Sequence, residues 1–150
     1  MSVYVSAKAD YALRALLQIA AAYPGQLTMT DIVTSQDLPR SYVEAILPDL
    51  RRADFLRLRR GGHASYSLAR SPSEISVGAV LRSVDGPLTR VRGLPPDEIH
   101  YAGVARQLSK LWLAATNNLE QLLNSVTLAD VISGNWPQDI LHLRAVVNRP

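Results

Sequence analysis

The chain has 150 residues and a formal net charge of +3, with 47% hydrophobic and 19% charged residues, which suits one core or a compact head with an appended arm. No apolar run approaches the roughly 18 residues needed to cross a bilayer, and the N-terminus lacks a signal-peptide layout, so we expect a cytoplasmic protein without a membrane partner. The absence of cysteine excludes disulfides, thiolate metal sites and a cysteine nucleophile.

The positive charge is concentrated in one segment. Residues 40–70 carry seven arginines against three acidic residues, a net charge of +4, whereas the rest of the chain sums to −1. Such a concentration of arginine suits a polyanion, because neutralising phosphates releases condensed counterions. A solvated charged face is the alternative that charge alone leaves open.

The first half of the chain is predicted to begin with two helices. Ser6 can cap the first, since its hydroxyl can accept from an unpaired N–H of the first turn, and Pro24-Gly25 ends that helix. Thr30 is expected to cap a short second helix over 31–36.

A third helix is predicted over 40–53, after the turn Asp37-Leu38-Pro39. Pro48 inside it removes a hydrogen bond, so we expect a bend there. Two helices separated by a three- or four-residue turn are typical of a helix-turn-helix.

The hydrophobic period changes to two after Phe55. Leu56 and Leu58 alternate with arginines, residues 60–64 turn the chain, and an alternating segment returns to Leu68. The pattern predicts a β-hairpin with apolar residues facing inward and arginines facing outward. A basic hairpin directly after a helix-turn-helix has the layout of a wing.

The second half is predicted to hold a short helix, a loop and a long helix. Ser76 can cap the fourth helix, which Asp85-Gly86-Pro87 ends. A long helix should run over 97–125, roughly 40 Å at 1.5 Å per residue. Thr127 and Asp130 resemble a capping box for a short final helix. One stripe of the long helix has the 4-3-4-3-4 spacing of a helix–helix seam: Leu108, Trp112, Ala115, Leu119, Leu122 and Val126.

These elements predict a mainly α-helical fold with a small β-hairpin. We expect a winged helix-turn-helix head over 1–86, a loop over 87–97, a dimerisation helix with a short capping helix over 98–134, and a tail over 135–150. A helix with the apolar stripe just described cannot hide all of it against so small a head, so a homodimer is expected.

Several segments carry a resemblance to a known family, and their order and spacing matter more than any one of them. They are SAKADYALR at 6–14, SYVE at 41–44, RGG at 60–62, ISVGAV at 75–80, LW at 111–112 and VTLADV at 126–131. Over roughly residues 1–134 the chain resembles the Rrf family of bacterial winged-helix transcription regulators. The resemblance implies a homodimer that binds DNA.

The resemblance stops at the cofactor. Many relatives carry three cysteines in the loop before the long helix, where they bind an iron–sulfur cluster, but the matching stretch, about Gly86 to Arg106, has none. Asp10 lies where some relatives supply a carboxylate ligand, yet one carboxylate cannot hold a cluster. We interpret Asp10 as a first-turn acid favoured by the helix dipole, and we expect no cofactor.

The predicted DNA contacts lie mainly in the third helix and the wing. Ser41 and Glu44 are near the start of the recognition helix, where side chains reach base edges, and Glu can accept from cytosine N4. Tyr42 could contact phosphate or pack against the first helix. Arg51 and Arg52 are interpreted as cations favoured at a helix C-terminus rather than as contacts. The predicted set is Lys8, Thr28, Thr30, Arg40, Ser41, Tyr42, Glu44, Arg59, Arg60, Gly61, Gly62 and His63.

The expected function is a homodimeric transcription regulator, a repressor, that binds double-stranded DNA at an inverted-repeat operator. Its effector, a small molecule or a protein, is not identified by the sequence. The alternative is an interaction module that kept the winged-helix shape but lost operator binding. We expect no enzyme, because the sequence has no Gly-x-Ser-x-Gly, phosphate-binding glycine loop or HExxH. We also expect no metal site, because His63, His100 and His142 are far apart in the sequence.

Overall fold

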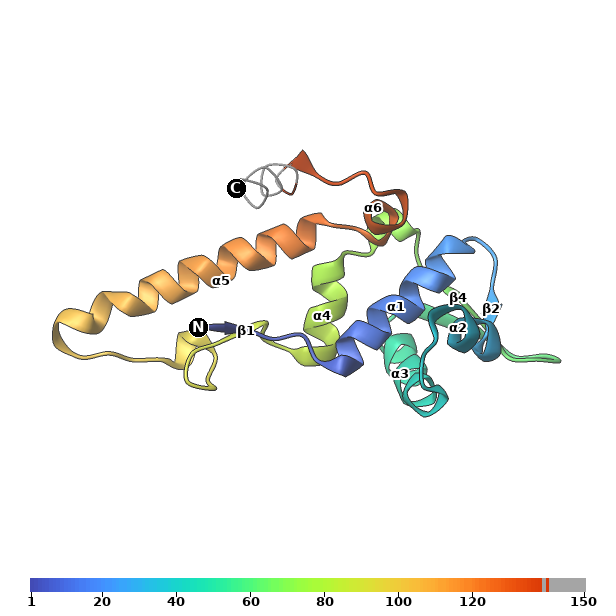
Figure 1. Ribbon diagram of the computed structural model, residues 1–150, viewed down its shortest axis with the longest axis horizontal. Coiled ribbons are helices and arrows are strands. Elements are labelled where there is room, and N and C mark those ends of the chain that lie inside the picture. The colour runs from blue at the N-terminus through green and yellow to red at the C-terminus, as the bar shows by residue number, and fades with distance from the viewer. Residues whose placement is uncertain (139, 141–150) are drawn as a thin grey trace.

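The computed structural model describes residues 1–138 and 140. Figure 1 shows α1–α3 and a sheet at one end, the long helix α5 at the other, and α4 between them. Helix α1 (Ala7–Ala21) begins as predicted, because the Ser6 hydroxyl accepts a hydrogen bond from the Ala9 N–H at 3.0 Å. His142, named in the sequence analysis, lies outside the described residues.

Helix α2 (Met29–Gln36) begins two residues earlier than predicted, and its cap is Thr28. The Thr28 hydroxyl accepts from the Asp31 N–H at 3.2 Å, and the Asp31 carboxylate accepts from the Thr28 N–H at 2.9 Å. The choice of Thr30 as the cap was wrong, because only Thr28 has an acid three residues later that can complete this reciprocal pair.

Helix α3 (Arg40–Arg52) continues through Pro48, which lies on its exposed side. The opposite side is fully apolar and packs into the core beside α1; its buried residues are Val43, Ile46, Leu47 and Leu50. The bend expected at Pro48 stays a prediction. Burial of one apolar stripe fixes which side of α3 faces solvent.

The predicted hairpin is confirmed as β3 (Leu56–Arg59) and β4 (Ser65–Leu68). A third strand, β2 (Leu27–Thr28), pairs with the other edge of β4, so the antiparallel order is β2-β4-β3. Strand β2 was not predicted, because two residues are too few to show an alternating pattern. This strand ties the start of α2 directly to the wing.

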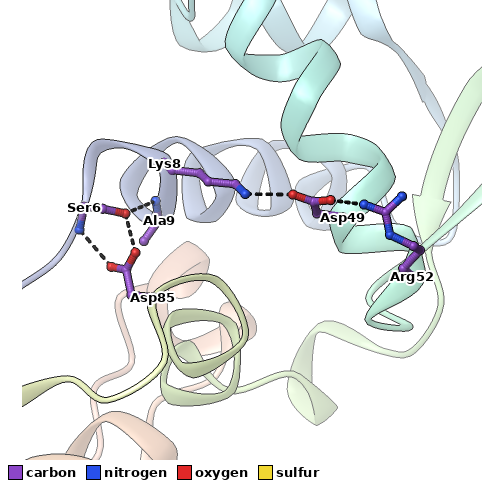
Figure 2. Close-up of polar contacts among 6 residues, drawn as sticks. All are labelled: Ser6, Lys8, Ala9, Asp49, Arg52 and Asp85. Carbon is purple, nitrogen blue, oxygen red and sulfur yellow. Dashed lines mark hydrogen bonds and ion pairs between the residues drawn. The ribbon is translucent and has the colours of Figure 1, made fainter. Parts of the chain in front are cut away.

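Helix α4 (Val77–Asp85) begins after Ser76, whose hydroxyl accepts from the Ala79 N–H at 3.0 Å, as predicted. Its last residue, Asp85, accepts hydrogen bonds from the Ser6 hydroxyl and, at 2.8 Å, from the Ser6 N–H (Figure 2). Ser6 therefore joins the end of α4 to the beginning of α1.

The segment between α4 and α5 is more structured than the expected loop. Strand β5 (Thr89–Arg90) pairs antiparallel with β1 (Ser2–Val3), and 3-10 turns occupy Pro96–Glu98 and Gly103–Gln107; another precedes α4 at Pro72–Glu74. Helix α5 spans only Leu108–Ser125. At 1.5 Å per residue its 18 residues measure about 27 Å.

The predicted start of the long helix at Asp97 was therefore wrong. Gly103 has a φ of +57°, a left-handed conformation that interrupts regular helix, and it separates the turn at Pro96–Glu98 from α5. Ile99, in this stretch, is only 2% exposed and is thus buried outside any long helix.

Helix α6 (Leu128–Ser133) has the predicted capping box between Thr127 and Asp130, and Gly134 ends it with a positive φ. Leu128 is fully buried in the core that contains α1, so this last helix packs back onto the head. The mainly α-helical winged-helix fold is thereby confirmed. Within the described part of the chain, no helix is long and apolar enough to span a bilayer.

Candidate nucleic-acid interface

The exposed side of α3 carries the polar residues predicted to contact DNA. Ser41 and Glu44 are both exposed there, opposite the buried stripe. Side chains near the start of a recognition helix reach base edges, so the contact predicted for these two residues stays a prediction that their exposure allows.

A groove of about 530 Å³ lies between the start of α2, the start of α3 and the turn of the wing. It joins three segments that are distant in the sequence, and five of the predicted contacts line it: Thr28, Thr30, Arg40, Glu44 and His63. Arg40 Nε lies 3.3 Å from Glu44 Oε1, and Arg40 Nη1 donates to the Thr30 hydroxyl at 3.4 Å. We call this the reading groove.

Of the two contacts predicted for Tyr42, phosphate or the first helix, the structure shows packing against the first helix, α1. Its ring packs edge-to-face against Tyr11 of α1, with 5.3 Å between ring centroids, yet the residue remains 50% exposed. The contact with α1 orients the ring, and the exposed half is free to meet a ligand.

Lys8 lies away from the reading groove. Its Nζ donates to Asp49 Oδ2 at 2.7 Å, and Arg52 donates to the other Asp49 oxygen (Figure 2). The hydrogen bond from Lys8, more than any other contact, lowers the pKa of the Asp49 carboxyl. Lys8 thus sits beside the C-terminal half of α3, a position that no sequence pattern indicated.

The wing divides its arginines between two faces. The register pairs Arg57 with Ser67 and Leu58 with Tyr66, and side chains alternate between the faces of a strand. Arg57 and Arg59 line a hollow on the face of the wing beside residues 24–26. Arg60 lines a groove on the face beside the end of α3, which we call the front of the wing.

The turn of the wing contains the two predicted glycines. Gly61 and Gly62 have φ of +139° and +68°, and a Cβ at either position would meet no atom within 4 Å. The turn therefore needs glycine for its backbone conformation and not for space.

The groove in front of the wing, about 420 Å³, is lined by two arginines that were not among the predicted DNA contacts. Arg51 and Arg52 of α3 line it with Pro48, and Leu58, Arg60 and Tyr66 of the wing complete it. Positions 40, 44 and 48 are four residues apart, and 51 and 52 follow three and four residues later, so all of them lie on one side of the helix. This spacing could have placed Arg51 and Arg52 beside the predicted contacts.

The residues present do not fit an iron–sulfur cluster. The chain has no cysteine, and the described residues contain no group of three or more His, Asp or Glu able to hold a metal ion. The Asp10 carboxylate pairs with Arg14 at 3.6 Å. In the segment after α4, Thr89 is fully buried, with its hydroxyl 2.6 Å from that of Thr116.

Helix α5 has two neighbouring stripes of side chains, and none of its residues is buried. The stripe 109, 112, 116, 119 and 123 faces the rest of the chain: Ser109 donates to the Ile99 carbonyl, Trp112 Nε1 donates to the Tyr101 hydroxyl at 2.9 Å, and Leu119 packs near Leu81 and Leu88. The neighbouring stripe 108, 111, 115 and 122, which we call the open stripe, has Leu108 and Leu111 exposed and Ala115 and Leu122 half-buried.

The predicted seam mixed these two stripes. Trp112 and Leu119 belong to the stripe that faces the chain itself, whereas Leu108, Ala115 and Leu122 belong to the open one. Val126 is a correction, because it follows α5, is 4% exposed and accepts a hydrogen bond from the Val77 N–H. Val126 therefore serves the fold of its own chain.

Comparison with known proteins agrees with this fold. Residues 5–134 match the Rrf2 family, described as an iron-dependent transcriptional regulator. A protein of Mycobacterium tuberculosis named as an HTH-type transcriptional regulator is 38% identical over 140 residues, covering 93% of this chain and 87% of the relative. CymR of Bacillus subtilis is 27% identical over 130 residues, covering 86% and 89%.

Solved structures resemble the chain over nearly its whole length. The structure of B. subtilis CymR, titled as the global cysteine regulator, has a TM-score of 0.74 and 25% identity over 88% of this chain and 98% of that one. The IscR structure from T. potens has a TM-score of 0.70 and 27% identity, covering 90% of each. The chain belongs to the Rrf2 family of DNA-binding transcriptional regulators, which are not enzymes.

Proposed function

We propose that this protein is a homodimeric transcriptional repressor that reads an inverted-repeat operator and works without an iron–sulfur cluster. The observation that carries the proposal is the reading groove, which brings residues of α2, α3 and the wing to one exposed surface. A winged helix-turn-helix uses these three elements to hold DNA.

In the proposed complex the start of α3 enters the major groove. Ser41 and Glu44 meet base edges there, and Glu44 accepts from a cytosine amino group. Arg40 is held by Glu44 and Thr30 in the free protein, with its side chain 56% exposed. On DNA it exchanges those partners for a phosphate, which leaves Glu44 available to a base.

The proposed dimer uses the open stripe of α5. Leu108 and Leu111 are 38% and 55% exposed, and Ala115 and Leu122 continue the stripe along the helix. A row of apolar side chains at spacings of three, four and seven suits a second helix lying alongside. A second copy of this chain offers the same stripe, as a two-fold interface requires.

The proposed regulator senses something other than a bound cluster. The family description names iron, yet this chain lacks the thiolates that hold such clusters. A small molecule or a partner protein is the proposed effector.

Selection of an operator from random duplexes, followed by binding of Glu44→Ala, tests the proposal. The selected site should be an imperfect inverted repeat with half-sites about one helical turn, or a multiple, apart. Glu44→Ala should relax preference at one position of each half-site, by on the order of 1–3 kcal/mol, with the salt dependence nearly unchanged.

Glu74→Ala is the matched control, because it removes the same charge from an exposed position outside the groove. It should bind the operator as the parent does. If the parent shows no preference among duplexes, the protein is instead an interaction module that kept the winged-helix shape.

A further inference from the structure

The groove in front of the wing differs in charge from the reading groove. Three of its six lining residues are arginines and none is acidic, whereas the reading groove balances Arg40 against Glu44. Among the described residues, neither Arg51 nor Arg60 has a carboxylate within 4 Å. Such a groove attracts an anion.

The two grooves share one lining residue and border the same helix. Tyr66 lines both of them, and α3 borders both, with Arg40 and Glu44 at one end and Arg51 and Arg52 at the other. From Arg40 to Arg52 the helix rises about 18 Å, which exceeds the roughly 12 Å width of the major groove. A helix that places its start against bases thus carries its far end to a phosphate backbone.

We propose that the groove in front of the wing, hereafter the second groove, binds the phosphate backbone of duplex DNA through Arg51, Arg52 and Arg60, beside the bases read by Glu44. The proposal rests on the DNA binding proposed above and adds Arg51 and Arg52 to the contact surface. Guanidinium groups bind phosphate through paired hydrogen bonds, which orients the partner as well as attracting it.

The ion pairs in Figure 2 give Lys8 an indirect role in this site. Asp49 lies on the same helix as Arg52, and an uncompensated carboxylate there would repel the backbone. Lys8 donates to one Asp49 oxygen and Arg52 to the other, so the three side chains together keep a net positive charge. Lys8 therefore acts as a positioning residue that offsets Asp49.

The test compares two double variants in filter binding or anisotropy over a range of salt concentrations. Arg51→Ala/Arg52→Ala should weaken binding to the operator and to random duplex alike, by about tenfold or more, and flatten log K against log salt by about 0.9 for each phosphate that is no longer neutralised. Arg106→Ala/Lys110→Ala removes two exposed cations near the start of α5 and should change neither quantity comparably. Light scattering checks that both variants keep the mass of the parent.

Two further variants separate phosphate binding from folding. Arg51→Lys/Arg52→Lys keeps both charges but not the paired hydrogen bonds, so relative to the alanine variant it should restore the salt dependence and only part of the affinity. Asp49→Asn should tighten binding about twofold, because it removes a carboxylate that pairs with Arg52 of the groove. If Asp49 has a purely structural role, Asp49→Asn should lower the melting temperature without tightening DNA binding.

The outcomes separate this inference from the proposed function. If the parent selects an operator but the arginine double variant binds like its control, the second groove is not a DNA site and the reading groove stands. If the parent binds no duplex at low salt, both proposals are overturned. Uniform weakening with retained operator preference supports the second groove.

Discussion

Helices α3 and α5 use their apolar residues in opposite ways. Helix α3 has 13 residues and buries four of them, each at 2% exposure or less, while α5 has 18 residues and buries none. The head thus completes its core inside one chain, because α1, α3 and the sheet surround it. Helix α5 instead leaves Leu108 and Leu111 exposed, and these are the side chains that the proposed dimer would cover.

This contrast matches the two proposed tasks, DNA binding and dimerisation. The exposed side of α3 is polar and charged, which suits a reversible partner such as DNA. The open stripe of α5 is apolar, which suits a permanent partner.

Placing two charges on the open stripe should break the proposed dimer. Leu108→Asp/Leu111→Asp should give a particle of about 16.4 kDa by light scattering, where the parent should give about twice that mass. Operator affinity should fall by about 10²-fold or more, because two linked half-site contacts become independent.

The control adds the same charges to the solvent side of α5. Asn117→Asp/Gln121→Asp changes two exposed positions away from both stripes and should leave the mass unchanged. Leu119→Asp is a poorer test, since Leu119 packs within its own chain. A stable monomer of the unmodified protein would rule out the dimer.

The crossing of α4 and α5 should tolerate no side chain at Gly78. A Cβ there would lie 2.9 Å from the Asn124 backbone nitrogen, and it would also meet the Asn124 side chain. Gly78→Ala should lower the free energy of unfolding by about 1–3 kcal/mol, as overpacking does.

The sign of this effect is informative. In an unconstrained helix, Gly→Ala stabilises by roughly 0.5–1 kcal/mol, because alanine loses less backbone entropy on folding. Denaturant unfolding that showed stabilisation would mean that α4 and α5 do not approach so closely.

The smallest expected effect concerns the cap of α2 in the head. The hydrogen bond from the Thr28 N–H, followed by that from the Thr28 hydroxyl, lowers the pKa of Asp31. A carboxyl with a lowered pKa in the folded state stabilises it above the unfolded pKa, and this contribution is lost as pH falls through the folded pKa.

Asp31→Asn should therefore lower the melting temperature slightly near pH 7, and the difference from the parent should shrink as the pH falls below 3.8. Asp97→Asn, which removes an exposed carboxylate outside any capping box, serves as the control. A difference independent of pH would mean that the charge of Asp31 does not matter to the cap.

The sequence alone determined the features that depend on neighbours within a few residues. The caps at Ser6, Ser76 and Thr127 were predicted correctly, because each hydroxyl reaches a backbone N–H only three residues away. The wing and the inner side of α3 followed from periods of two and 3.6 in the apolar residues. A charge of +4 over 40–70 located the candidate interface.

Only the tertiary structure decided the contacts between distant segments. A two-residue strand such as β1 is too short to show a hydrophobic period. The pairing of Ser2 with Arg90 arises only when the chain folds. The spacing on α5 predicted a seam but could not say which stripe its own chain covers. Likewise, the pairing of Lys8 with Asp49 and the meeting of Arg52 with the wing depend on how α1, α3 and the hairpin pack. Local propensity carries no information on such packing, because many arrangements of the same helices satisfy it equally.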